Sequence, residues 1–291
     1  MRLCRFNEGR IGLVEGDVIY DVSGVAELLP AMRWPLPLGD ALIARLPEIW
    51  KRAAELKARA ETFDIADVKL LSPVANPGKI IGAPLNYRAH LAETHASVAL
   101  HNNAHKTDFG AEERPIDKLG VFLKANSSLI GAGEDIVLNF RDTRRTDHEV
   151  ELAVVIGKQV RDVSVENALD VVAGYAIGLD TTVRGPEERS FRKSIDTYST
   201  LGPYLVSADE IADPDNLEFW IDVGSERRQH SNTNRLIVGV RELISLCSHW
   251  YTLHPGDIIM TGTPEGVSPI KAGDSITAWI EGIGTLKTVV R

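Results

Sequence analysis

Two glutamates on one expected strand are the residues whose spacing points most directly to chemistry. The segment Asp147–Gly157 reads DHEVELAVVIG, in which Glu149 and Glu151 alternate with apolar side chains. Because the side chains of a strand alternate between its faces, the apolar set points to the core and the two glutamates share the opposite face, about 7 Å apart. Two carboxylates on a sheltered strand repel each other. The pattern favours a bound cation, although two solvated strand residues would show the same spacing.

A third carboxylate completes a candidate metal site. Asp180 ends the uncharged, strand-compatible segment Val171–Leu179. Together with Glu149 and Glu151 it would form a hard oxygen site without cysteine, suited to Mg²⁺, Mn²⁺ or Ca²⁺. The neighbouring His148 is expected to point to the other face of its strand, away from these carboxylates.

His90 and Glu93 are candidates for acid–base chemistry. They lie three residues apart in the segment Asn86–Thr94, where one or two helical turns are expected, and that spacing makes them neighbours on a helix. A carboxylate beside an imidazole fixes its tautomer and raises its basicity, as activating a water near neutral pH requires. A solvent-facing ion pair has the same spacing, so both interpretations stay open.

A small N-terminal module is expected to precede the domain that carries these residues. The glycine turns and helix formers of the first part of the chain predict three short strands and two helices: Arg2–Phe6, Gly9–Glu15, Asp17–Asp21, Leu38–Leu46 and Pro47–Thr62. Two prolines and a glycine in Leu71–Lys79 indicate a linker. We therefore expect an α/β module over residues 1–72 and the large domain over residues 73–291.

The large domain is expected to be α+β and strand-dominated, a mixed β-roll or sandwich with peripheral helices. Apolar runs alternate with turn chemistry at 80–83, 121–124, 136–138, 150–156, 171–179, 201–206, 218–223, 257–261, 275–280 and 285–290. Helical signals are few, at Ser164–Ala173 and Gly239–Trp250. The segment RRQHSNTNR, which contains Gln229, Asn232 and Thr233, is interpreted as a polar loop.

Composition restricts the classes of function. The 291 residues are 44% hydrophobic and 25% charged, with a formal charge of −9, so we expect a globular protein without a nucleic-acid partner, because no basic patch offsets the acidic surface. Two cysteines, Cys4 and Cys247, suit a reducing compartment. No signal peptide or membrane-spanning run is expected. These features predict a cytoplasmic protein that does not bind membranes.

Several motifs together resemble the fumarylacetoacetate hydrolase family. DHEVELAVVIGK, GYAIGLD, KSIDTYSTLGPYLV, GDIIMTGTPEGV and EGIGTLKTVV occur in that order, and the resemblance spans about Ser72–Arg291. It implies the family's mixed β-roll, commonly as a homodimer, and a divalent metal, usually Mg²⁺, on Glu149, Glu151 and Asp180. The N-terminal module is similar to the variable N-terminal portion of some bacterial members.

The resemblance also implies roles for other residues. His90 and Glu93 match a dyad that serves as general base on a lid, here about residues 86–120, and Lys193 matches a lysine beside the metal. Arg184 matches an arginine that could bind a substrate carboxylate, while Thr263 lies in TGTPEGV, a loop that lines the site; with Tyr87 they form the expected substrate-binding set. TGTPEGV has no Gly-Lys-Ser/Thr ending and so is not a phosphate loop.

The chain departs from the family pattern in two places. Between Glu93 and Phe122 it is longer than in compact members, and the extra stretch contains His95, His101 and His105, whose role the sequence leaves open. After Arg184 the chain continues GPE, where the family often has an acidic residue and a glutamine. A longer lid and an altered loop would both change which substrates enter.

The reaction implied is hydrolysis of a carbon–carbon bond in a 1,3-dicarbonyl 2-oxo acid of the acylpyruvate or fumarylpyruvate type. A metal on the carboxylates would chelate the 2-oxo acid, His90 oriented by Glu93 would deprotonate a water that attacks the distal carbonyl, and Lys193 would help hold the departing enolate. A role in aromatic compound catabolism is expected. Two alternatives stay open: an isomerase, tautomerase or decarboxylase of a 2-oxo or 2-hydroxy dienoic acid on the same metal, and a catalytically silent metal- or metabolite-binding protein.

Overall fold

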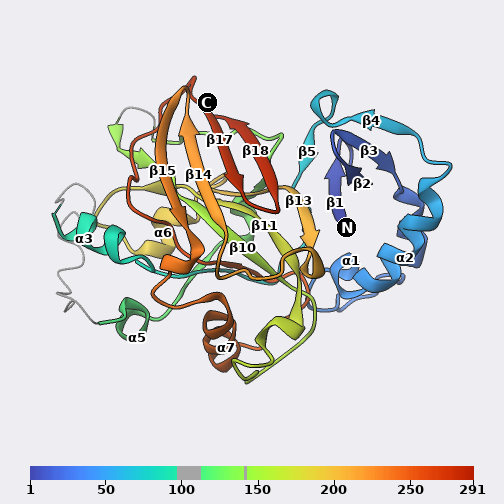
Figure 1. The fold of residues 1–291 in the computed structure, drawn as a ribbon, viewed down its shortest axis with the longest axis horizontal. Coiled ribbons are helices and arrows are strands. Elements are labelled where there is room, and N and C mark those ends of the chain that lie inside the picture. The colour runs from blue at the N-terminus through green and yellow to red at the C-terminus, as the bar shows by residue number, and fades with distance from the viewer. Residues whose placement is uncertain (97–112, 141–142) are drawn as a thin grey trace.

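The computed structural model describes residues 1–96, 113–140 and 143–291 (Figure 1). In these ranges the α-helices are α1 (Ala41–Ala44), α2 (Leu46–Lys57), α3 (Arg88–Ala96), α5 (Pro115–Leu119), α6 (Arg189–Lys193) and α7 (Val240–Trp250). The strands of the N-terminal part are β1 (Arg2–Phe6), β2 (Arg10–Glu15), β3 (Val18–Asp21), β4 (Thr62–Asp64) and β5 (Leu70–Leu71). Those that follow, up to the end of the chain, are β6 (Ile80–Gly82), β7 (Phe122–Lys124), β8 (Leu129–Gly131), β9 (Thr146–Asp147), β10 (Val150–Ile156), β11 (Val172–Asp180), β12 (Thr182–Val183), β13 (Ser199–Ser207), β14 (Glu218–Val223), β15 (Glu226–Asn232), β16 (Ile258–Met260), β17 (Ser275–Ile280) and β18 (Gly284–Val289).

One large mixed sheet runs through the molecule. Its strand order is β4-β3-β2-β1-β13-β11-β10-β16-β6-β7, with β5 on β1 and β8 on β13. Most neighbours are antiparallel, but β13 pairs with β8, and β16 with β6, in parallel. The long central strands β10 and β11 pair antiparallel, with Val150 opposite Leu179, so the start of β10 lies beside the end of β11.

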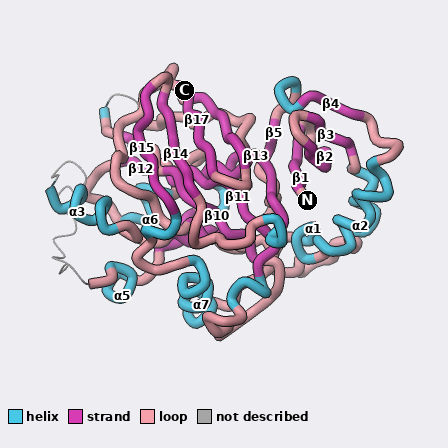
Figure 2. The backbone as a smooth tube through the Cα atoms, in the orientation of Figure 1, coloured by secondary structure: helices cyan, strands magenta, loops and turns pink. Residues whose placement is uncertain are grey.

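A second, antiparallel sheet of order β15-β14-β17-β18 packs against the first. Inward residues of the small sheet, such as Phe219 and Ile221, share one core cluster with Leu152 and Val154 of β10. Figure 2 shows the two sets of strands with helices placed around them. This arrangement confirms the predicted strand-dominated mixed fold with peripheral helices.

The other face of the large sheet is also covered. Ala153 and Val155 of β10 belong to a second core cluster together with Ile43, Leu46 and Ile49 of the N-terminal helices. Every residue of β10 is therefore buried. The face that carries the two glutamates is sheltered rather than solvated, which is the condition under which their repulsion matters.

The N-terminal module does not have a sheet of its own. Its strands continue the large sheet because β1 pairs with β13, placing Leu3 opposite Leu205. The three predicted N-terminal strands are present as β1, β2 and β3, and the two predicted helices as the shorter α1 and α2.

Three local expectations were wrong. RRQHSNTNR lies mostly in β15, an edge strand that turns Gln229 and Ser231 inward and charged residues outward, so its polarity reflects an exposed face. Ser164–Ala173 forms turns, a short 3₁₀ helix (Ala168–Val171) and the start of β11 instead of one continuous α-helix. The polar segment Ala96–Leu119 has no sustained period and predicts a loop without secondary structure, but Pro115–Leu119 is a helix.

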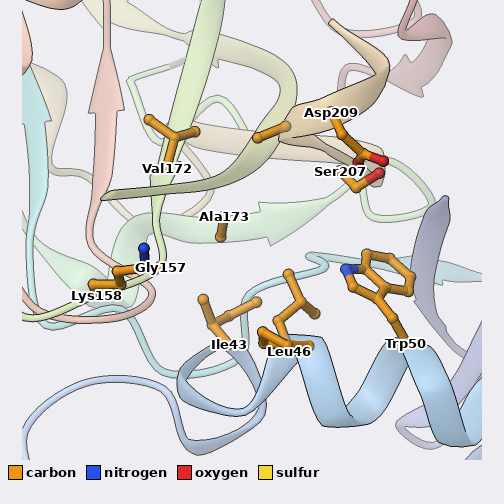
Figure 3. A pocket seen from close by; sticks show the side chains of 11 residues that line it. Ile43, Leu46, Trp50, Gly157, Lys158, Val172, Ala173, Ser207 and Asp209 are labelled. Carbon is orange, nitrogen blue, oxygen red and sulfur yellow. The ribbon is translucent and has the colours of Figure 1, made fainter. Parts of the chain in front are cut away.

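Two cavities lie along the seam between the N-terminal module and the rest of the chain. The smaller, about 260 Å³, is lined by Ile43, Leu46 and Trp50 from the module and by Val172 and Ala173 at the start of β11 (Figure 3). The larger, about 700 Å³, is lined by residues that include Arg2, Asp17, Tyr204 and Lys287. Neither contains a residue predicted to act in catalysis.

Among the described residues, no helix is both long and apolar enough to cross a membrane.

Candidate active site

Three buried carboxylates converge where β10 starts and β11 ends. Glu149 directly precedes β10, Glu151 lies in it, and Asp180 ends β11. The backbone N–H of Asp180 donates to the carbonyl of Glu149 (2.9 Å), which places these two residues opposite each other. One oxygen from each of the three side chains lies within 4.8 Å of the others. All three residues are buried, so these oxygens form a compact acidic site.

Two buried lysines hold this site together. The ammonium of Lys193, at the end of α6, donates to Glu149 Oε2 (2.6 Å), Asp180 Oδ2 (2.6 Å) and Thr182 Oγ1 (2.7 Å). Lys124 in β7 donates to the other oxygen of Asp180 and to the Tyr198 carbonyl. Burial lowers the pKa of Lys124, and Asp180 acts against that shift. Asp180 is thus held by one lysine on each oxygen.

The glutamates differ in how their charge is compensated. Burial disfavours ionisation of Glu149, but Lys193, Arg184 and His90 outweigh it and lower the pKa of this carboxyl. For Glu151 burial prevails, followed by repulsion from Asp180, and its pKa rises well above the usual value. Glu151 accepts a hydrogen bond from the Gly262 N–H (2.6 Å) and has no ion-pair partner in the described part of the chain. The donor set and this uncompensated carboxylate both fit a divalent cation.

Arg184 supports the carboxylates from behind. Its guanidinium donates to Asp147 Oδ2 (2.8 Å) and Glu149 Oε1 (2.9 Å), and only 9% of the side chain is exposed. Asp147 accepts a further hydrogen bond from Arg145 (2.7 Å). Arg184 was predicted to bind a substrate carboxylate, but the structure engages its guanidinium with the protein's own carboxylates and so favours a role in orienting Glu149.

His90 and Glu93 form the predicted pair on α3. His90 Nδ1 lies 3.0 Å from Glu93 Oε2, and the second carboxylate oxygen accepts from the Gly266 N–H (3.1 Å). His90 is buried and lies within electrostatic reach of Glu149. His95 ends the same helix, whereas His101 and His105 lie outside the described residues.

The loop TGTPEGV follows β16 and is held on both sides. Thr263 Oγ1 donates to the Val150 carbonyl (3.0 Å) and accepts from Gln229 Nε2 (2.9 Å). The same Gln229 accepts from the Val150 N–H (3.2 Å) and contacts His148 Nδ1. The hydroxyl predicted to contact substrate therefore anchors the loop to β10. Burial lowers the pKa of His148 to about 4, which keeps the imidazole neutral. Its ring nitrogens contact Gln229 and Ser268 and none of the three carboxylates.

Tyr87 and Asn86 connect α3 to the same loop. Asn86 Nδ2 donates to the carbonyls of Val238 and Thr261 (both 2.9 Å). Tyr87 is buried, with its ring edge-on to Phe219 at 6.2 Å. Burial raises the pKa of Tyr87, with the charge of Glu151 as the second cause, so its ring lies near the carboxylate site. No contact in the structure tests its predicted substrate-binding role.

The sequence analysis assigns no role to Lys124, Asp147 or Gln229. Lys124 follows an apolar run and resembles a surface residue at the end of a strand; only its place beside β6 buries it. Asp147 could have been suspected from its position two residues before Glu149, which repeats the alternation of the acidic strand. The sequence around Gln229 does not distinguish it from a surface glutamine. Gln229 reaches the site only because segments distant in sequence pair with each other.

Comparison with known proteins agrees with this geometry. Residues 79–291 match the family model described as fumarylacetoacetate hydrolase, C-terminal. A maleylpyruvate hydrolase of Aquipseudomonas alcaligenes is 53% identical over 291 residues, covering 100% of this chain and 99% of the relative. A mitochondrial oxaloacetate tautomerase of Rattus norvegicus is 34% identical over 306 residues, covering 98% of this chain and 90% of the relative.

A solved structure supports the fold over the whole chain. The maleylpyruvate hydrolase of Sphingobium sp. SYK-6, in complex with manganese(II) and pyruvate, superposes with a TM-score of 0.81 at 36% identity and covers 100% of this chain and 98% of its own. The family match, the relatives and the carboxylate geometry are consistent with one another. The chain belongs to the fumarylacetoacetate hydrolase family.

Proposed function

We propose that this protein is a divalent-metal-dependent hydrolase that cleaves a carbon–carbon bond of an acylpyruvate, with maleylpyruvate as the first candidate substrate. The observation that carries the proposal is the convergence of Glu149, Glu151 and Asp180 with the ammonium of Lys193. The 53% identity to a maleylpyruvate hydrolase supports this choice of substrate.

Glu149, Glu151 and Asp180 are the residues that would hold the metal. Bound there, a divalent cation would act as a Lewis acid toward the carboxylate and 2-oxo oxygens of the substrate. We expect Mg²⁺ as the usual ion, with Mn²⁺ able to replace it, because both favour carboxylate oxygen; the manganese in the Sphingobium relative supports the second.

His90 is proposed as the general base. Glu93 contacts Nδ1 (3.0 Å) and thereby leaves Nε2 as the basic nitrogen. A water deprotonated by Nε2 would attack the carbonyl distal to the 2-oxo acid. Because Gly266 holds the second oxygen of Glu93, the loop after β16 fixes the direction in which the dyad points.

Lys193 is proposed to stabilise the leaving group. Cleavage of the carbon–carbon bond releases a pyruvate-type enolate, and an ammonium already placed beside the carboxylates can neutralise the developing oxygen charge. Substrate contacts from Tyr87 and Thr263 remain part of the proposal, with the ring of Tyr87 as a wall of the pocket. For Arg184 we propose the orienting role described above.

A second candidate function is a tautomerase, because the same residues would support tautomerisation if no water attacked the substrate. The similarity to an oxaloacetate tautomerase is the observation that favours this candidate. The test is incubation of the Mg²⁺-loaded protein with maleylpyruvate and with enol oxaloacetate, followed by NMR. Two fragments from maleylpyruvate, one of them pyruvate, are expected. Recovery of intact maleylpyruvate together with rapid enol–keto conversion of oxaloacetate would favour the tautomerase.

We also propose a homodimer in the cytoplasm. Both cysteines are buried and unpaired, which suits a reducing compartment, and the dimer follows from membership of the family. Sedimentation analysis of the purified protein would test the oligomeric state.

A further inference from the structure

Helix α6 presents two cations to one aromatic ring. Arg189 and Lys193 are four residues apart on this helix and therefore lie on the same side of it. The guanidinium carbon of Arg189 lies 5.5 Å from the centroid of the Phe122 ring, and the Lys193 ammonium lies 5.3 Å from it. The lysine contacts the carboxylates, and the arginine lies about one helical turn before it in α6, against the same ring.

The neighbouring arginines form hydrogen bonds with the protein, whereas Arg189 contacts only an aromatic ring among the interactions of the described residues. Arg184 bonds to Asp147 and Glu149, as described above. Arg144 donates two hydrogen bonds to the carboxylate of Glu187 (2.9 and 2.7 Å), and Arg192 donates to the carbonyl of the same residue (2.8 Å). Arg189 forms no hydrogen bond or ion pair with any residue that the structure describes. Its planar donor fork is available for a ligand.

The surroundings of Arg189 make an unpaired guanidinium costly. Burial lowers its pKa, and the carboxylates of Glu149, Glu188 and Asp180 oppose that shift, which puts the side chain within electrostatic reach of two candidate metal ligands without contact to either. Arg189 also lies close enough to Arg192 to disfavour that residue's charge. A partly desolvated arginine beside another cation favours an anion, and its geometry suits a carboxylate held by two parallel hydrogen bonds.

We propose that Arg189 binds the distal carboxylate of the substrate, so that the site selects 2-oxo acids that carry a second carboxylate at the other end of the chain. This inference rests on the proposed function for the placement of the 2-oxo end beside Lys193. Arg189 would then distinguish substrates by the group at their distal end. An acylpyruvate that ends in a methyl group would fill the same space but leave the guanidinium unpaired.

The direct test is a binding comparison that needs no turnover. Calorimetry of the Mn²⁺-loaded protein with 2-oxoheptanedioate and 2-oxoheptanoate compares two non-cleavable ligands of equal chain length. The wild type is expected to bind the diacid about 10–100-fold more tightly, as a hydrogen bond between charged groups predicts. Arg189→Met should remove this preference and leave the monoacid affinity within about twofold, and Arg189→Lys should restore part of it.

A matched control is Arg227→Met, which removes an exposed arginine on the outer sheet that pairs with Asp222; it should keep the full preference. Equal binding of the two acids by the wild type, or an unchanged preference in Arg189→Met, would overturn the assignment. Thermal unfolding of each variant establishes that it is folded.

Turnover separates this inference from the proposed function. With maleylpyruvate, Arg189→Met should lower kcat/KM about 10–100-fold, whereas with acetylpyruvate, which has no distal carboxylate, the change should be under about threefold. An equal loss on both substrates would refute the role of Arg189. If the wild type cleaves neither substrate, the hydrolase proposal fails, and the calorimetric preference still decides whether Arg189 binds a distal carboxylate.

Discussion

The two ends of the β10–β11 strand pair differ in the charge that they bury. At one end, the start of β10 and the end of β11 bring together Glu149, Glu151 and Asp180. At the other end, the strands border the smaller of the two cavities described above, which we call the seam cavity. It lies beside Trp50, and mostly apolar side chains line it (Figure 3). Both ends belong to the same pair of strands. What separates them is buried charge that the chain itself leaves partly uncompensated.

The largest effect on activity is expected when one aspartate at each end of the strand pair is replaced by asparagine. Asp180→Asn keeps the shape of the side chain but removes a charge that a divalent ion requires, so we expect loss of tight Mn²⁺ binding and a fall in kcat on the order of 10³-fold or more. Isothermal titration with Mn²⁺ and assays with maleylpyruvate measure both. Asp209→Asn, on the rim of the seam cavity, should change neither. Full metal binding and activity in Asp180→Asn would show that the carboxylate end is not a metal site.

The second effect concerns the base on α3. His90→Gln should lower kcat about 10²–10⁴-fold, because general acid–base catalysis contributes that much, while leaving Mn²⁺ affinity nearly intact. His230→Gln is the matched control: His230 is an exposed histidine on β15, also paired with a glutamate, Glu218. Retained activity in His90→Gln would exclude this histidine as the base.

A third comparison concerns the free energy of unfolding after replacement of one lysine at each end of the β10–β11 strand pair. Lys124 is fully buried against Asp180, and breaking a buried ion pair from one side costs roughly 3–5 kcal/mol. Lys124→Met should therefore lower the free energy of unfolding by about 3 kcal/mol in urea. Lys158→Met, on the rim of the seam cavity, should change it by less than about 0.5 kcal/mol. Similar values for the two variants would mean that Lys124 does not stabilise the acidic site.

The smallest effect is a dependence of metal affinity on pH. Without metal, burial and Asp180 raise the pKa of Glu151, so below that pKa the carboxyl holds a proton that a cation must displace. Mn²⁺ affinity should fall as the pH falls, by up to about tenfold per unit below the Glu151 pKa, and binding should release protons. Titrations in buffers of different ionisation enthalpy count those protons. An affinity that stays flat between pH 5 and 8 would contradict this account of Glu151.

Much of this site could be predicted because its information is local. The alternation in DHEVELAVVIG placed Glu149 and Glu151 on one face, and the end of an apolar run identified Asp180; the structure brings the three together. The His90–Glu93 spacing likewise needs only helix geometry. Residues that act through distant pairing could not be found in this way. Lys124 and Gln229 reach the site only because β6 and β7, and β14 and β15, pair as they do.

The same distinction explains the errors in the fold. Strands with a clean alternation, such as β10 and β17, were expected at nearly their observed bounds. The sequence of the edge strand β15 predicts a loop because its outward residues are polar and its inward residues, Gln229 and Ser231, are polar as well. Its hydrogen-bond partner β14 decides its conformation, and no local pattern reports that.

The pairing of β1 with β13 has a consequence for anyone who shortens this chain. β13 is an interior strand that lies directly beside β11, the carrier of Asp180. Deleting residues 1–72 would remove the backbone partner of the Leu205–Ser207 end of β13. The N–H and C=O groups left unsatisfied there would be a template for association with other molecules. A shortened protein could keep every side chain of the carboxylate site and still precipitate. A poor yield would then reflect the exposed backbone of β13 and not a defect in the carboxylate site.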